Sequence, residues 1–263
     1  MIKAYPFTYT NYIHVLQNAL QKRYKFVSFR EMVENQKIYE KKIILRHDID
    51  ISLEKAHRMA KLEAYLNIKS IYFIMVSSEF YNVSSPSSKD ILTEIVAMGH
   101  EIGLHFDNTA YKYQDLDEMR SLIFREAALL ESIVNTDITA VSFHRPSREI
   151  LEQNLNLNPM VNAYNHVFFN EIKYISDSRK TWIEKSIDEV INEDQYSKIQ
   201  LLIHPIWWGE EETTFHDSFI HFTRDYKRNM FHKFSRNIRD FPEELKSFFY
   251  EAIESSGREK YGD

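Results

Sequence analysis

The chain has no cysteine among its 263 residues and is poor in glycine and proline, with 5 and 6 residues of these types. Without cysteine there is neither a disulfide nor a thiolate metal site, so any metal ion must bind histidine and oxygen ligands. The scarcity of glycine and proline, together with the lack of repeats and low-complexity tracts, argues against long linkers and solenoids.

The chain also lacks a long apolar run and an excess of positive charge. No apolar run approaches the roughly 20 residues that a membrane-spanning helix needs, and the N-terminus has no basic region followed by an apolar core. We therefore expect no membrane span and a cytoplasmic location. The net charge of −6 opposes non-specific attraction to polyanions, so we expect no nucleic-acid partner.

What the chain does contain is an alternation of strand and helix patterns. Its apolar content of 43% is enough for a sizeable core, and we expect one domain over residues 1–263. Short apolar runs predict strands at 42–46, 70–76, 101–105, 138–143, 171–175 and 199–203. Helix-spaced apolar positions predict helices at 10–22, 28–36, 52–66, 88–98, 114–134, 148–155 and 181–193.

This alternation predicts an α/β fold of parallel strands, either a barrel or a doubly wound sheet. No glycine-rich phosphate-binding loop follows the first predicted strand, which argues against a nucleotide-binding sheet. Within the single domain we expect a helical lead-in at 1–40, a barrel at 41–210 and C-terminal helices at 211–263.

Ionisable side chains gather where the predicted strands end. The first strand is followed by His47, Asp48 and Asp50, and later strand ends carry His105, Asp107, His144, Arg145, Asp177 and His204. Because the carboxyl ends of parallel strands open on one face of an α/β fold, these side chains are expected to meet there. Histidine and carboxylate ligands suit Zn²⁺ or another divalent first-row ion, which can activate water for hydrolysis.

Two aspartates of the first cluster are predicted to share a strand face. Asp48 and Asp50 are two residues apart, which corresponds to about 6.6 Å along an extended strand. That separation leaves room for a metal ion on one carboxylate and a water between the metal and the other. His47 would point to the opposite face, so we expect it to be a packing or supporting residue rather than a ligand. Arg46 is expected to be a charge support.

Taken in order, five segments resemble the NodB-type polysaccharide deacetylases: ILRHDID, MGHEIGLHFD, SFHRPS, YISDSRKTW and LLIHPIWW. With YFIMVSSEFYNVSS they cover roughly residues 40–210. The resemblance implies an α/β fold, a distorted (β/α) barrel with N- and C-terminal helical additions. It further implies that a divalent metal, with Zn²⁺ the first expectation, serves to remove acetyl groups from sugars. Asp48 would be the catalytic base, and Asp50 and His105 metal ligands.

One position departs from that family. A second metal histidine is usual four residues after the first, but Thr109 stands there. The metal is then either lost or held by a substitute, Asp107 or His144. We favour His144, because it ends the next strand, whereas Asp107 would have to turn back towards the site.

The remaining motifs imply a general acid, charged residues near the acid and the base, and aromatic side chains that line the substrate site. Arg145 is the arginine expected near the base, although it is shifted by one residue and His144 takes its usual place. The resemblance implies His204 as the general acid and Asp177 as a catalytic carboxylate that orients a neighbour. Aromatic faces stack on sugar rings, and contacts with the substrate are predicted for three tryptophans: Trp182, Trp207 and Trp208. Trp207 and Trp208 follow a strand and could equally belong to the core.

The sequence thus predicts a metal-dependent sugar N-deacetylase with a carbohydrate substrate. The RHDID and HPIWW motifs are similar to a branch of the family that acts in cell-surface polysaccharide and lipopolysaccharide assembly. Two alternatives stay open. One is a metal-independent amidohydrolase or a glycoside hydrolase on the same fold, and the other is an inactive barrel that binds a glycan or a protein. The presence of both Asp48 and His204 argues against the inactive barrel, since a binding site needs neither a base nor an acid.

Overall fold

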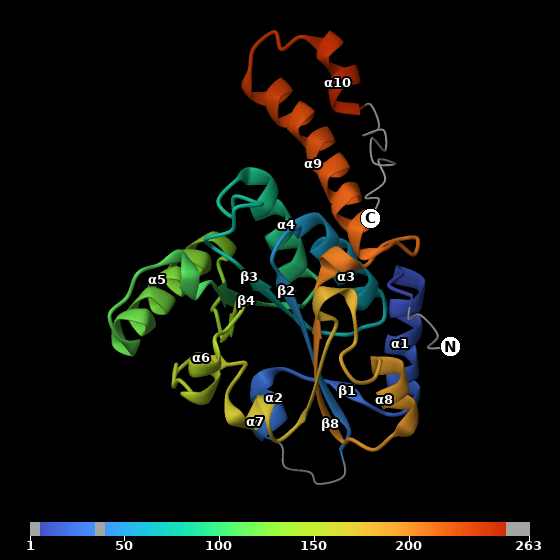
Figure 1. The fold of residues 1–263 in the computed structure, drawn as a ribbon, viewed down its shortest axis with the longest axis vertical. Coiled ribbons are helices and arrows are strands. Elements are labelled where there is room, and N and C mark those ends of the chain that lie inside the picture. Colours follow the sequence, from blue (N-terminus) through green and yellow to red (C-terminus); the bar gives the residue numbers. More distant parts are fainter. Residues whose placement is uncertain (1–5, 35–39, 251–263) are drawn as a thin grey trace, which may run out of the picture. The chain divides into compact units, whose positions relative to one another are not determined.

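Residues 6–34 and 40–250 are described in the computed structural model of this protein (Figure 1). Residue contacts group the chain into two compact units, residues 1–212 and 213–263. The division lies next to the boundary predicted at residue 210. The single domain predicted over 1–263 stays a prediction.

The first unit is built on one parallel sheet. Its strands are β1 (Lys25–Phe26), β2 (Lys42–Ile49), β3 (Ile71–Ile74), β4 (Glu101–Phe106), β5 (Ala140–Phe143), β6 (Val161–Asn162), β7 (Lys173–Ser176) and β8 (Lys198–Ile203). Seven of them follow the order β6-β5-β4-β3-β2-β8-β7, and β1 pairs with the start of β2. The sheet curls into a distorted half-barrel flanked by helices (Figure 1), which confirms the predicted fold class.

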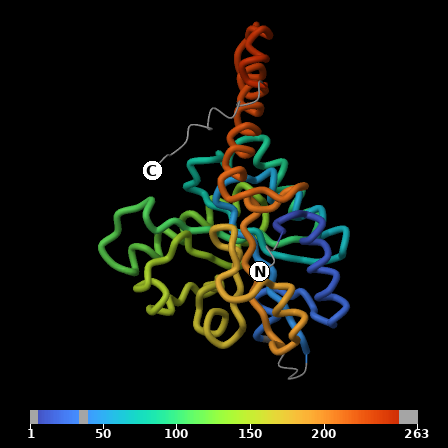
Figure 2. Tube along the Cα trace, turned by 45° about the vertical axis from the view of Figure 1, so that its right-hand side comes forward, coloured from blue at the N-terminus to red at the C-terminus, as the bar shows by residue number. Residues whose placement is uncertain are grey.

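Helices cover the outside of this sheet. In the first unit they are α1 (Tyr9–Gln21), α2 (Phe29–Glu34), α3 (Leu53–Tyr65), α4 (Pro86–Ala97), α5 (Leu116–Val134), α6 (Arg148–Glu152), α7 (His166–Phe169) and α8 (Ile187–Glu193). The helix predicted at 181–193 begins only at Ile187, because Ser186 caps it together with Glu189. α1 and α8 are far apart in sequence but lie side by side (Figure 2), and Asn18 of α1 donates a hydrogen bond to Asp188 of α8.

The predicted lead-in differs from the structure in one respect. It contains the short strand β1 between its two helices, because Lys25 and Phe26 pair with the first residues of β2. The last two residues of the helix predicted at 28–36 lie outside the described residues.

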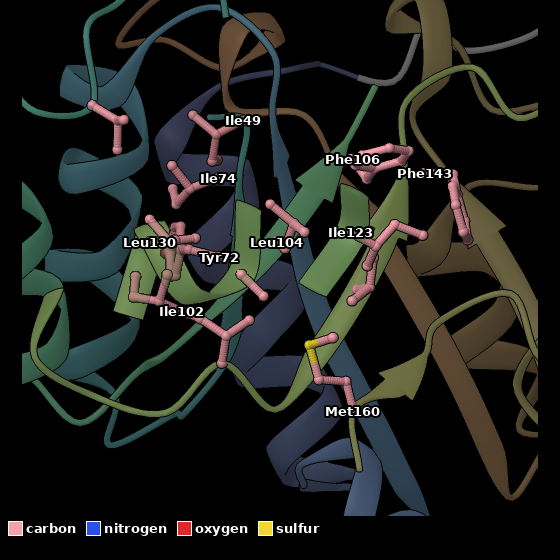
Figure 3. Close-up of a cluster of buried hydrophobic side chains, with 14 of the residues drawn as sticks. Ile49, Tyr72, Ile74, Ile102, Leu104, Phe106, Ile123, Leu130, Phe143 and Met160 are labelled. Atoms are coloured by element: carbon pink, nitrogen blue, oxygen red, sulfur yellow. The ribbon is translucent and has the colours of Figure 1, made fainter. Parts of the chain in front are cut away.

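An apolar core fills the space between the sheet and helices α3, α4 and α5. Alternate strand residues point into it, among them Tyr72 and Ile74 from β3 and Ile102 and Leu104 from β4, and Ile123 of α5 packs onto them (Figure 3). Each such side chain contributes about 1.5–3 kcal/mol when it is fully buried. Since strand side chains alternate, the residues between these face the barrel interior.

The interior is apolar at one end. Ile44 and Phe73 pack there with Phe29 of α2. Gly103 of β4 permits the close packing, because a Cβ at this position would lie 2.5 Å from the Phe73 ring. Further along the same strand faces, the side chains become polar and charged, and these residues form the candidate site.

The second unit consists of α9 (Phe215–Asn237) and α10 (Lys246–Tyr250), with a short 3-10 helix between them. The ring of Phe231 in α9 packs against Phe249 and Tyr250 of α10. The structure therefore has helices where C-terminal helices are predicted, and residues 251–263 of that prediction lie outside the described residues. Over residues 6–34 and 40–250, no helix is long and apolar enough to cross a membrane.

Candidate functional site

Three predicted metal ligands meet at the carboxyl ends of the strands. Asp50 follows β2, His105 lies in β4 and His144 follows β5. Asp50 Oδ1 lies 2.9 Å from His105 Nε2 and 3.3 Å from His144 Nδ1. One ligand atom from each of the three residues lies within 4.8 Å of the other two. The structure thus brings together three side chains that come from separate sequence motifs.

The chemistry and spacing of these donors fit a divalent ion. A carboxylate oxygen and two imidazole nitrogens are a ligand set of catalytic zinc sites, in which a further position stays open for water. Two donors that each lie about 2.0–2.1 Å from one zinc ion are roughly 3.0–3.4 Å apart, close to the distances that Asp50 makes. The imidazole rings of His105 and His144 are inclined by 80° to each other, so their nitrogens approach the candidate metal position from different directions.

Thr109, at the usual position of a second histidine, belongs to the short 3-10 helix η1 (Asn108–Ala110). Its backbone N–H and its hydroxyl both donate to Asp107 Oδ1, at 2.8 and 2.7 Å. Asp107 is therefore used to cap this turn, whereas His144 contacts Asp50. Of the two predicted substitutes for the missing histidine, His144 is the one that lies with the other candidate ligands.

Asp48, the predicted base, is buried and held by Arg46 from the same strand. Arg46 Nη2 donates to Asp48 Oδ2 at 2.7 Å, and Arg46 Nε donates to Oδ1 at 3.2 Å. Burial is the largest influence on the pKa of Asp48 and acts to raise it, but the charge and hydrogen bonds of Arg46, together with the charges of His105 and His204, hold this pKa below its usual value. Asp48 is therefore ionised at neutral pH and able to accept a proton.

The arginine beside the base in this structure is Arg46, and a role of Arg145 near the base stays a prediction. β2 continues to Ile49, so residues 46 and 48 share one strand face and form a buried pair. Arg46 also donates to Gln200 at 3.0 Å and to the hydroxyl of Tyr164 at 3.1 Å. Arg145 lies in the loop after β5, where it is exposed and has a φ of +46°.

His204, the predicted acid, is anchored to Asp177. Asp177 Oδ1 lies 2.6 Å from His204 Nδ1 and also accepts the backbone N–H of His204 at 2.9 Å. Burial disfavours the charged imidazole, but the hydrogen bond and the charge of Asp177 prevail and raise the pKa of His204 to about 9. His204 is therefore protonated at neutral pH, and its side chain is 14% exposed.

The three tryptophans predicted to contact the substrate lie in different environments. Trp182 is half-buried and stacks on Phe7 with ring planes 10° apart, and Trp207 is buried. Trp208 is fully buried against Phe7 and Tyr12, and its Nε1 donates to Asp177 at 2.8 Å. Trp208 thus has no face open to a sugar in this structure and holds Asp177 instead. Sugar binding by Trp182 and Trp207 stays a prediction.

A second buried charge cluster lies on the other face of β2. His47 Nε2 is 2.7 Å from Glu63 of α3, and the His47 ring stacks on Tyr72 with centroids 4.4 Å apart. Tyr12 and Tyr72 donate their hydroxyl hydrogens to the same carboxylate. Burial acts to raise the pKa of Glu63, but the charge of His47 and further partners lower it to about 2. His47 is thus a buried supporting residue on the face away from the candidate ligands.

The site residues that sequence reasoning missed are neutral side chains, namely Ser142, Tyr164 and Gln200. They surround the Arg46–Asp48 pair and belong to none of the roles expected from the motifs. Ser142 and Gln200 interrupt the otherwise apolar strand runs AVSF and IQLLI. A polar residue inside a buried strand was the signal for these two, because buried polar groups are almost always hydrogen-bonded.

Comparison with known proteins finds neither a matching family model nor a matching curated protein. Solved structures do match. A family 4 carbohydrate esterase from Bacillus anthracis is 13% identical, covers 83% of this chain and 86% of that chain, and has a TM-score of 0.41. A family 4 acetyl xylan esterase from Clostridium thermocellum, in complex with a cobalt ion, is 14% identical, with 62% and 73% covered and a TM-score of 0.37.

A third match is a CE4 family pseudoenzyme from Bacillus anthracis. It is 13% identical and has a TM-score of 0.42, and the match covers 72% of this chain and 62% of that chain. This chain therefore spans less than two thirds of the length of that protein. The three solved structures are of the superfamily that the sequence motifs resemble.

Proposed function

We propose that this protein is a metal-dependent hydrolase that removes the acetyl group from the nitrogen of an acetamido sugar. The observation that carries the proposal is the occurrence, in one site, of an ionised Asp48 and a protonated His204. A base and an acid held in opposite protonation states are what the hydrolysis of an amide requires. The cluster of Asp50, His105 and His144 supplies suitable metal ligands beside them.

Asp50, His105 and His144 would hold the ion, with Zn²⁺ as the first candidate because two of the donors are imidazoles. When bound, such an ion polarises a carbonyl group and lowers the pKa of water. Asp48 would accept the proton of the attacking water. Its carboxylate is already held by two hydrogen bonds from Arg46, so little reorganisation is needed when the water attacks.

His204 would donate a proton to the leaving nitrogen. An amine leaves readily only when it is protonated, so this reaction depends on a general acid. With a pKa of about 9, the imidazolium is the main form at neutral pH. Asp177 holds the ring through Nδ1, which leaves Nε2 as the atom that would donate.

The carbohydrate substrate and the cytoplasmic location rest on the sequence. The motifs RHDID and HPIWW support a precursor of a cell-surface glycan, so that a nucleotide-linked or lipid-linked sugar is the form to test first. Trp182 and Trp207 would line the sugar site through their aromatic faces.

Acetate release from a panel of acetamido sugars and their nucleotide-linked and lipid-linked forms tests the proposal. We expect release by the zinc-loaded protein, loss of release with a chelator, and recovery when zinc is restored. Asp48→Asn should abolish turnover while elemental analysis still finds zinc in the protein. Turnover that persists in Asp48→Asn, or that is indifferent to the chelator, would contradict the proposal.

A further inference from the structure

Ser142 connects the predicted base to a predicted metal ligand. It lies in β5, is fully buried, and faces the barrel interior. Its hydroxyl contacts three ionisable side chains: Nδ1 of His105 at 2.8 Å, Nη2 of Arg46 at 3.2 Å, and Oδ2 of Asp48 at 3.1 Å. None of the roles assigned above uses Ser142.

Counting donors and acceptors determines where the hydrogens lie. A serine hydroxyl has one hydrogen to donate and two lone pairs that accept. Arg46 can only donate, so it occupies one lone pair of Ser142. Both oxygens of Asp48 accept hydrogen bonds from Arg46, so the carboxylate is an acceptor and the single hydrogen of Ser142 points to it. The remaining lone pair of Ser142 must accept from Nδ1–H of His105.

This arrangement selects one form of the His105 ring. With a hydrogen on Nδ1, the other nitrogen, Nε2, is the one that can present a lone pair to a metal ion. Nε2 also lies 2.9 Å from Asp50 Oδ1, where in the metal-free protein it donates a hydrogen that a bound ion would replace. A hydrogen bond from the far nitrogen of a metal-binding histidine orients the ring and makes it a stronger ligand.

We propose that Ser142 is a positioning residue that presets the Nδ1–H tautomer of His105 for metal binding and links this ligand to the base Asp48. The inference rests on the proposed function, since it takes Asp50, His105 and His144 as the metal ligands. Ser142, Asp48 and His105 are each at most 2% exposed. Water therefore has no open route by which to replace the hydroxyl, and its loss would leave both partners short of a hydrogen bond.

Zinc affinity of the full chain, measured by competition with a chelating dye at one pH, tests this role. Ser142→Ala removes the hydroxyl with little change in shape, and we expect zinc to bind about 10–100-fold more weakly. Ser142→Thr keeps the hydroxyl and should bind zinc much as the wild type does. Ser88→Ala is the matched control, because Ser88 is a buried serine of α4 whose hydroxyl bonds to Ser85, and its affinity should not change.

Nitrogen-15 spectra of the zinc-loaded wild type give a second readout that needs no variant. His105 should show a protonated Nδ1 and a metal-bound Nε2. Zinc on Nδ1, or wild-type affinity in a folded Ser142→Ala, would overturn the inference while leaving the proposed function intact. A wild-type protein that takes up no zinc would instead overturn the proposed function, and this inference with it.

Discussion

Asp177 Oδ1 and His204 Nδ1 lie 2.6 Å apart, and the same oxygen accepts the backbone N–H of His204. One carboxylate thus holds both the ring of the predicted acid and the chain that carries it. Trp208 donates to the second oxygen of Asp177, which leaves the carboxylate little freedom to rotate. This contact determines the pH range in which the proposed acid keeps its proton.

Activity should fall on the alkaline side as His204 loses its proton. In the metal-free protein its pKa is raised from 6.5 to about 9. A bound dication disfavours the imidazolium, so in the zinc-loaded protein the alkaline limb of kcat should lie below that value. Asp177→Asn removes the stabilising negative charge and should move the limb further down. The pH–rate profiles of both zinc-loaded proteins check this, and an unmoved limb would refute the role given to His204.

Arg46→Lys should lower the stability of the fold and raise the pKa of Asp48. Lysine keeps the charge but cannot make the two parallel hydrogen bonds to Asp48. We expect the free energy of unfolding to fall by about 1–3 kcal/mol. The acid limb of kcat/KM should move to higher pH, because a less well bound carboxylate holds its proton more tightly. Denaturant titrations and pH–rate profiles measure the two effects.

The matched variant for that experiment is Arg145→Lys. Arg145 is exposed, so its replacement should leave the unfolding free energy within about 0.5 kcal/mol of the wild type. A larger shift of the acid limb in Arg145→Lys than in Arg46→Lys would support the expectation that Arg145 supports the base.

His144→Ala should remove zinc from the protein, whereas Asp107→Asn should not. His144 contributes one of three clustered donors, while Asp107 is occupied by two hydrogen bonds from Thr109. Titration with zinc in the presence of a chelating dye compares the two variants. A selective loss of zinc in Asp107→Asn would show that the turn after β4 rearranges to supply the ligand.

Gly103→Ala should destabilise the barrel. The added Cβ would lie 2.5 Å from the Phe73 ring and 3.1 Å from the carbonyl oxygen of Ala140. Forced overpacking of this kind costs about 1–3 kcal/mol. Gly209→Ala is the control, since its Cβ would meet nothing nearer than 3.5 Å. Thermal unfolding of both variants is the measurement, and equal melting temperatures would contradict the packing described for β4.

Six of the eight strands, all except β1 and β6, could be predicted because each contains a short apolar run. The pair β6 and α7 was missed, since a two-residue strand and a four-residue helix show no periodicity. β2 was predicted to end at residue 46 but runs to Ile49. Charged residues normally end a strand, and here hydrogen-bonded partners from other strands allow them to stay within it.

The candidate ligands could also be predicted, because acids and histidines at the ends of parallel strands must converge. Arg46 could be expected as a charge support, but its pairing with Asp48 depends on which residues share a strand face. Once β2 extends beyond Arg46, the pairing with Asp48 follows from alternation alone. Trp208 shows a related ambiguity. An aromatic residue after a strand can either stack on a sugar or belong to the core. The full burial of Trp208 shows that it packs in the core in this structure.

The two charge clusters on opposite faces of β2 also bear on how the chain folds. β2 pairs with β3 on one edge and with β8 on the other, and a shift of pairing by one residue would exchange its faces. Arg46 and Asp48 would then move together to the face on which Glu63 lies, and His47 would turn into the barrel interior. Glu63 would lose its contact with His47, and Arg46 would lose its hydrogen bonds to Gln200, Ser142 and Tyr164. Each buried polar group left without a partner costs about 1–3 kcal/mol. The polar contacts of β2 on its two faces thus favour the observed pairing register over one shifted by a residue.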